Sequence, residues 1–195
     1  MVPRILEPPG SPPTRTSHNL FFALWPSDAV RAAIAAAARQ LRSELAPTGR
    51  WLAPRRYHMT LHFLGNHAAL PAELVARALA AGDAVNISPF EFALDIAGSF
   101  RNRTIPWWFG SNEAPSELHD VSAALASAFP PQGVEAVGES EFVPHVTVLR
   151  DARIPLARRA IAAIDWPVDD FVLVDSRLGA DPDYSILRRW SLMRR

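Results

Sequence analysis

Two apolar, strand-like segments of this chain each carry a histidine followed two residues later by a threonine. The first segment, YHMTLHFLGN, contains His58 and Thr60, and the second, FVPHVTVLRD, contains His145 and Thr147. Side chains alternate between the two faces of a strand, so the histidine and threonine of each pair should share one face. Two such strands placed near each other would form a polar and nearly symmetric cleft.

The chemistry of these four side chains suits reaction at a phosphorus atom. Two histidines with ordinary pKa values of about 6.5 can hold opposite protonation states near neutral pH, one as general base and one as general acid. Two threonine hydroxyls can donate hydrogen bonds to the oxygens of a tetrahedral anion held between them. A single H-x-T is most simply explained by a hydrogen-bonded core histidine, whereas two copies in matching strands favour a catalytic site.

Composition excludes several other chemistries. The chain has 195 residues, is 49% hydrophobic and carries 20 basic and 20 acidic side chains, so it is globular with no net charge. A nucleic acid would therefore be bound locally, at an end or a single group, rather than along a basic surface. The sequence contains neither cysteine nor lysine. Disulfides, cysteine-ligated zinc, a Walker-type phosphate loop and a lysyl-nucleotide intermediate are thereby excluded.

Apolar periodicity, caps and turn residues predict an alternation of strands and helices. Ser27 precedes an alanine-rich helical pattern, Pro71 opens a second helix and Ser116 caps a third. We expect strands over 18–26, 57–64, 90–98, 104–110, 142–149, 171–179 and 185–193. We expect helices over 28–45, 71–82, 116–129 and 156–164. This order divides the chain into two similar halves, 18–98 and 104–193, each with one H-x-T strand.

The N-terminal segment differs from the rest of the chain. Residues 1–17 contain five prolines and no apolar signal-peptide region, which predicts a disordered tail ahead of one domain over 18–195. No segment reaches the roughly 18 apolar residues of a membrane span. We expect a cytoplasmic protein that does not bind membranes.

H-M-T-L at 58–61 and H-V-T-V at 145–148 resemble the paired H-x-T-x motifs of the 2H phosphoesterase superfamily. The flanking segments LFFALWP, YHMTLHFLGN, FVPHVTVLRDAR and FVLVDSRL…YSILRRWSL resemble its RNA 2′,3′-cyclic phosphodiesterase branch, also called the 2′-5′ RNA ligase family. The resemblance covers residues 18–193 in several separate blocks that agree in order. It implies an α+β fold of two pseudo-symmetric lobes, with antiparallel sheets flanked by helices around a central cleft.

The resemblance also implies a reaction and roles for residues. RNA 2′,3′-cyclic phosphates would be opened to 2′-phosphomonoesters without a metal or any cofactor, by a monomer acting on single-stranded RNA ends or small cyclic nucleotides. His58 and His145 would be the acid–base pair, and Thr60 and Thr147 would hold the phosphate. The pairing of Phe63 with Arg150, each five residues after a histidine, implies a grip on the terminal nucleobase. Strict strand alternation would instead place these two side chains on the core face.

Other readings stay open at the level of sequence. The chain could be a 2H enzyme acting on a small cyclic nucleotide phosphate, or a non-catalytic module that only binds RNA ends or nucleotides. Without lysine, joining of RNA could only be the reverse of cyclic-phosphate opening. The segment HMTLH, with His67 nearby, superficially resembles a zinc-binding H-E-x-x-H helix, but the glutamate is missing and the pattern is that of a strand.

Several residues outside the paired motifs carry weaker expectations. We expect His62 at the edge of the cleft, and His18, His67 and His119 as ordinary surface or loop histidines. Arg101 and Arg103 are candidates for contacts to the RNA backbone. Pro106 is unusual inside the strand predicted over 104–110, because proline cannot donate a ladder hydrogen bond.

Overall fold

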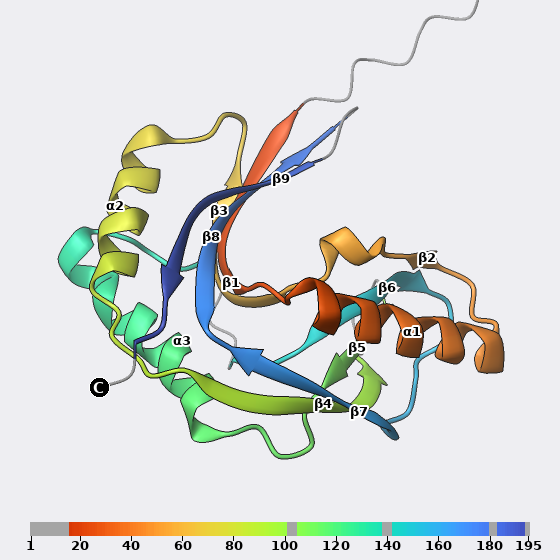
Figure 1. Cartoon of the computed structure of the whole chain (residues 1–195). Helices are drawn as coiled ribbons and strands as arrows, with labels where there is room; N and C mark the ends of the chain where they lie inside the picture. Colours follow the sequence, from red (N-terminus) through yellow and green to blue (C-terminus); the bar gives the residue numbers. More distant parts are fainter. Residues whose placement is uncertain (1–15, 101–104, 138–141, 180–182, 194–195) are drawn as a thin grey trace, which may run out of the picture.

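The computed structural model describes residues 16–100, 105–137, 142–179 and 183–193. Within these ranges the chain forms two antiparallel sheets and three α-helices (Figure 1). The first sheet has the spatial order β3 (Met59–His67), β1 (Ser17–Leu24), β8 (Asp170–Leu178), β9 (Asp183–Ser191). The second has the order β2 (Arg50–Trp51), β6 (Val146–Ala152), β5 (Ile105–Gly110), β4 (Phe90–Ser99), β7 (Arg159–Val168). The predicted α+β class with two antiparallel sheets is confirmed.

The helices cover different sheets. α2 (Ala72–Asp83) and α3 (Ser116–Ala128) lie on one side of the first sheet, and α1 (Asp28–Leu45) packs against β7 of the second (Figure 1). Leu20, Phe22 and Leu24 of β1 point toward the helix side and are fully buried. Burying such side chains stabilises the fold by about 1.5–3 kcal/mol each, so the apolar alternation of β1 decides which face of this sheet meets the helices.

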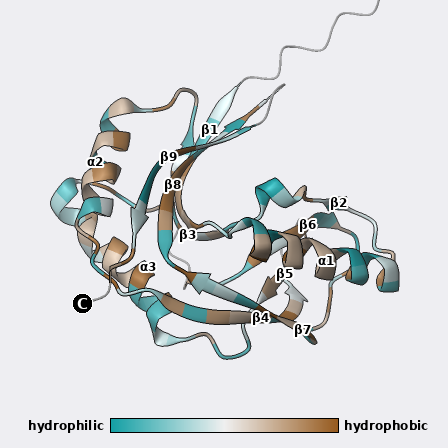
Figure 2. Cartoon of the chain, viewed as in Figure 1, coloured by the Kyte–Doolittle hydropathy of each residue, from teal (hydrophilic) through white to brown (hydrophobic). Residues whose placement is uncertain are grey.

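The hydropathy of the chain follows this packing (Figure 2). The central strand β8 is largely hydrophobic, and six of its residues in a row, from Phe171 to Ser176, are buried. Hydrophilic residues gather toward the C-terminal end of α1, where the last four residues, 42–45, are exposed. No helix in the described part of the chain is long and apolar enough to cross a membrane.

The predicted division into halves 18–98 and 104–193 is wrong. β8 and β9, from the end of the chain, return to the first sheet and pair with β1, while β4 pairs with β5 and β7 in the second sheet. The apolar run of β8 explains this exchange, because a strand buried on both faces needs a central place between two neighbours. β8 occupies such a position between β1 and β9.

The helix predicted over 156–164 is also wrong, because residues 159–164 belong to the edge strand β7 (Arg159–Val168). Its run of alanine and isoleucine has good helix propensity, but β7 pairs with β4 from Phe90↔Val168 to Ala97↔Arg159. Helix propensity is a weak preference that tertiary pairing overrides. Its buried residues Ile164, Trp166 and Val168 recur every second position, as strand pairing requires.

The other predicted elements are confirmed, with shifted ends. Ser27 caps α1, and its hydroxyl accepts the Val30 N–H at 3.3 Å. α3 is capped by Pro115 rather than by the expected Ser116, whose hydroxyl donates to Glu117 instead.

The expected tail over 1–17 lies outside the described residues except at its end, where Ser17 already begins β1. Pro106 sits at a register shift between β5 and β6, a bulge that tolerates proline inside a sheet.

A substitution at Gly82 can test how closely α2 packs on the first sheet. A Cβ atom at Gly82 would come within 2.4 Å of a ring carbon of Trp190 on β9, so Gly82→Ala should lower the free energy of unfolding by about 1–3 kcal/mol. Helix propensity alone would predict the opposite sign. The measurement is the urea midpoint, with exposed Ala76→Gly as the control that reports propensity at about 1 kcal/mol. A stabilised Gly82→Ala protein would contradict this packing.

Candidate active site

His58 lies directly before β3, after the short 3₁₀ turn η1 (Pro54–Arg56). Its Nδ1 is 2.8 Å from the carbonyl oxygen of Arg56. Since a carbonyl can only accept, Nδ1 carries the hydrogen and donates it. Nε2 is then the nitrogen of the neutral ring that keeps a free lone pair, available to take a proton from a bound molecule.

His145 repeats this arrangement on the second sheet. It lies directly before β6, and its Nδ1 is 2.7 Å from the carbonyl oxygen of Val143, again two residues earlier. The ring meets Phe100 edge-on, with centroids 4.8 Å apart. Both H-x-T motifs therefore fix the same tautomer by the same local hydrogen bond.

Aromatic side chains enclose the ring of His58. Phe21 stacks on it at a centroid distance of 4.9 Å, Trp25 lies nearly parallel to it at 5.9 Å, and Tyr184 meets it edge-on at 5.5 Å. Sequence reasoning missed all three. The signal was present for two of them, because Phe21 and Trp25 alternate along FFALW and so share one strand face. Tyr184 comes from β9 and could not be assigned before the pairing of β8 and β9 was known.

Burial lowers the pKa of both histidines, and neighbouring cations lower that of His58 further. Burial is the main cause at His58, and the positive charges of Arg150, His145 and Arg56 add to it, so its pKa falls to about 4 although the Arg56 carbonyl opposes the shift. Burial also lowers the pKa of His145, again against its carbonyl partner. The influence of His145 and Arg150 on His58 means that the two motifs, from different sheets, lie within electrostatic reach of each other.

A β-bulge follows the threonine in both motifs. Between β1 and β3 the pairing jumps from Phe22↔His62 to Ala23↔Thr60, so Leu61 is the extra residue. Between β5 and β6 it jumps from Trp107↔Leu149 to Trp108↔Thr147, which leaves Val148 as the extra residue. A bulge reverses the alternation beyond it, and residues three positions apart then share a face.

The bulges place Phe63 and Arg150 on the same faces as the threonines, against the expectation from strict alternation. Phe63 is partly buried and packs against a cluster on the face of the first sheet that carries His58. The cluster consists of Phe21, Ala23, Val172 and Val174.

The exposed Arg150 lines a cavity together with Thr147. Arg50, Pro106 and Asp151 complete that cavity. Thr60 and Thr147 themselves are half-buried.

The bulge also overturns the expectation for His62. Its ring points to the helix side of the first sheet, where Nε2 lies 2.8 Å from the Ser122 carbonyl oxygen and the ring meets Phe129 edge-on. His58 and His62 thus lie on opposite faces of the sheet and do not form a shared metal site.

Nε2 of His67 contacts the carbonyl oxygen of Leu64, 3.2 Å away. The described ranges contain no group of three or more histidine, aspartate or glutamate side chains arranged to hold a metal ion.

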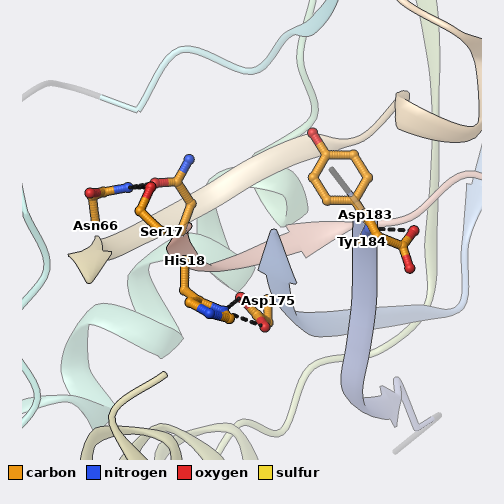
Figure 3. Close-up of polar contacts among 7 residues, drawn as sticks. Ser17, His18, Asn66, Asp175, Asp183 and Tyr184 are labelled. Carbon is orange, nitrogen blue, oxygen red and sulfur yellow. Dashed lines mark hydrogen bonds and ion pairs between the residues drawn. The ribbon is translucent and has the colours of Figure 1, made fainter. Parts of the chain in front are cut away.

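Two more histidines stand apart from the site. His18, expected at the surface or in a loop, is instead part of β1 and pairs with the buried Asp175, with Nδ1 2.9 Å from the carboxylate. Figure 3 shows this pair on the face of the sheet opposite to Tyr184. His119 is exposed on α3, as expected. Arg101 and Arg103 lie outside the described residues.

Arg31 of α1 supports the segment that precedes His58. Its guanidinium donates to the carbonyl oxygens of Pro54 at 2.7 Å, Tyr57 at 3.2 Å and Pro26 at 3.0 Å. The same group lies 5.3 Å from the ring centroid of Trp25. One side chain therefore joins the end of β1, the start of α1 and the lead-in to β3.

Comparison with known proteins gives this arrangement a family. The family model for the 2′-5′ RNA ligase superfamily matches residues 26–180. The RNA 2′,3′-cyclic phosphodiesterase of Thermus thermophilus is 33% identical over 185 residues, which cover 89% of this chain and 90% of that protein. The crystal structure of E. coli LigT complexed with 3′-AMP superposes with a TM-score of 0.73 at 28% identity, covering 91% of this chain and 99% of LigT. A LigT structure complexed with phosphate superposes with a TM-score of 0.70, at 28% identity and the same coverage.

The fold and the matches define the class as a 2H-type phosphodiesterase. The chain belongs to the 2′-5′ RNA ligase superfamily, since that model covers most of its length.

The charges around His58 can be tested by titration. Histidine NMR signals followed against pH should show His58 titrating near pH 4, and Arg150→Gln should raise that pKa because a cation that disfavours the imidazolium is removed. The matched control is Arg153→Gln, an exposed arginine just beyond β6. A His58 pKa near 6.5, or a His58 pKa that Arg150→Gln leaves unchanged, would contradict these electrostatic effects on His58.

Proposed function

We propose that this protein hydrolyses RNA 2′,3′-cyclic phosphate ends to 2′-phosphomonoesters by metal-independent acid–base catalysis with two histidines. The observation that carries the proposal is the repeated presentation of His58 and His145. In each, a backbone carbonyl holds Nδ1, and Nε2 has no hydrogen-bond partner among the described residues. Neighbouring family members named as RNA 2′,3′-cyclic phosphodiesterases support the substrate class.

In the proposed reaction, water attacks the phosphorus of the cyclic phosphate. His58, whose pKa of about 4 keeps it neutral near pH 7, takes a proton from that water. His145 as imidazolium gives a proton to the 3′ oxygen as the P–O3′ bond breaks. The negative substrate bound between the rings favours this protonated form. One water is consumed, and the 2′-phosphate and a free 3′-hydroxyl are the products.

The other site residues hold the substrate in this scheme. The hydroxyls of Thr60 and Thr147 donate hydrogen bonds to the two non-bridging phosphoryl oxygens, where negative charge builds up in the transition state. Phe63 and Arg150 hold the terminal nucleobase, because an aromatic ring and a guanidinium plane both stack on an unpaired base. Their positions beyond the two bulges, on the threonine faces, support this role.

Joining of RNA is a secondary activity in this proposal. A chain without lysine cannot carry an activated nucleotide on an ammonium side chain. The same histidines could only join RNA by using a 5′-hydroxyl in place of water. That hydroxyl would attack the phosphorus of a 2′,3′-cyclic end as the P–O3′ bond breaks, which forms a 2′-5′ linkage without ATP.

The first experiment is hydrolysis of a short RNA ending in a 2′,3′-cyclic phosphate, in EDTA, with the product phosphate located by NMR. We expect turnover that EDTA leaves unchanged and a 2′-phosphate product. A 3′-phosphate would show that the other P–O bond breaks. Binding without turnover would favour the non-catalytic module, and turnover only of small cyclic phosphates would favour the small-nucleotide enzyme.

The second experiment removes each imidazole. His58→Ala and His145→Ala should each lower kcat by about 10²–10⁴-fold, because each deletes one proton-transfer group. The double variant should be only slightly slower than either single variant, since the two groups act in one step. Exposed His119→Ala serves as the matched control, and circular dichroism checks that the variants fold. Near wild-type rates in either single variant would refute the acid–base pair.

A further inference from the structure

A second pocket lies directly beside His58. It is lined by Trp25, Arg55, Arg56, Asp183 and Tyr184, and its volume is ≈ 110 Å³. Trp25 and Tyr184 are the same side chains whose rings contact the His58 ring, at 5.9 and 5.5 Å between centroids. A molecule in this pocket is therefore separated from the His58 ring by a single aromatic layer.

The pocket presents two arginines, Arg55 and Arg56, that form no ion pair with a carboxylate of the described residues. Arg55 is exposed, and the guanidinium of Arg56 lies 4.9 Å from the Tyr184 ring centroid with one terminal nitrogen 3.5 Å from its hydroxyl. Nε of Arg56 is buried and has no hydrogen-bond partner among the described residues. Asp183 also lines the pocket, but its Oδ1 accepts the backbone N–H of Tyr184 at 2.8 Å.

Most other arginines with described partners are neutralised by carboxylates. Examples are Arg159 with Glu44, Arg188 with Asp83 and Arg189 with Asp170. Within the described ranges, neither Arg55 nor Arg56 forms an ion pair with a carboxylate. In a chain with zero net charge, two such cations side by side next to the candidate site point to an anionic ligand.

The volume of the pocket limits the size of the anion that it can hold. Pockets that enclose a drug-sized molecule usually measure about 300–1,000 Å³, so a volume of ≈ 110 Å³ suits a single phosphate group better than a whole nucleoside. An RNA ending in a 2′,3′-cyclic phosphate carries only one other anion on its terminal nucleotide, which is the phosphate at the 5′ oxygen.

We propose that the pocket formed by Arg55, Arg56 and Tyr184 binds the phosphate on the 5′ side of the terminal nucleotide. The inference rests on the proposed function and makes the enzyme selective for cyclic ends that carry this phosphate. Arg55 and Arg56 donate to its oxygens, as guanidinium groups do to phosphates, and the Tyr184 hydroxyl supplies a further donor. Trp25 forms the wall between this phosphate and the reacting one.

The test compares three substrates at constant ionic strength: adenosine 2′,3′-cyclic phosphate, its 5′-phosphorylated form, and the dinucleotide ApA ending in a 2′,3′-cyclic phosphate. Wild-type kcat/KM should be about tenfold or more higher for the two substrates with a 5′ phosphate, as expected for a charge-assisted contact. Arg55→Gln and Tyr184→Phe should each bring that ratio toward one. Comparing substrates within one variant cancels any effect on the chemistry at His58.

Control variants and outcomes separate this inference from the proposed function. Arg42→Gln, at an exposed position in the last turn of α1, removes the same charge elsewhere and should leave the ratio unchanged. Equal kcat/KM on all three substrates, or a ratio that survives in both Arg55→Gln and Tyr184→Phe, would overturn the phosphate pocket while the proposed function stands. No hydrolysis of any of the three would overturn both.

Discussion

The arrangement depends first on a short hydrogen bond from each imidazole to the carbonyl two residues before it. The bonds at His58 and His145 hold the rings at the entry to β3 and β6, and within the described part of the chain Nε2 of both rings has no hydrogen-bond partner. They also offset part of the cost of burying a polar ring, since a buried polar group without a partner is destabilising. The carbonyl belongs to the turn or extended segment that leads into each strand, so the geometry of the lead-in controls the geometry of the site.

The two sheets serve the site differently, although their motifs match. The first sheet surrounds His58 with Phe21, Trp25 and Tyr184, whereas His145 meets one described ring, that of Phe100. Burial is the main cause of the lowered pKa at both positions, but only His58 is also shifted by several nearby cations. The two histidines of a nearly symmetric pair of motifs therefore have unequal environments, and the proposed division into acid and base depends on such a difference.

The protein has no net charge, but its arginines differ in whether they pair with carboxylates. Ion pairs such as Arg159 with Glu44 lie at the exposed surface and contribute little to stability. The arginines near His58, which are Arg55, Arg56 and Arg150, have no carboxylate partner among the described residues, so their charge remains available to an anion. In a protein without net charge, such a local group of cations favours binding of a nucleic acid at an end or a single group over binding along its length.

The sequence by itself determined the four motif residues, the strands that carry them and most helices, because period-two alternation and caps such as Ser27 act over a few neighbouring residues. Only the tertiary structure decided which strands share a sheet, and it turned the predicted helix at 156–164 into β7 through pairing with β4. It also decided the faces of His62, Phe63 and Arg150, because one extra residue in a bulge reverses the alternation on which the prediction relied. Register is set by the partner strand, and Tyr184 reaches His58 only because β8 and β9 fold back to β1 across the length of the chain.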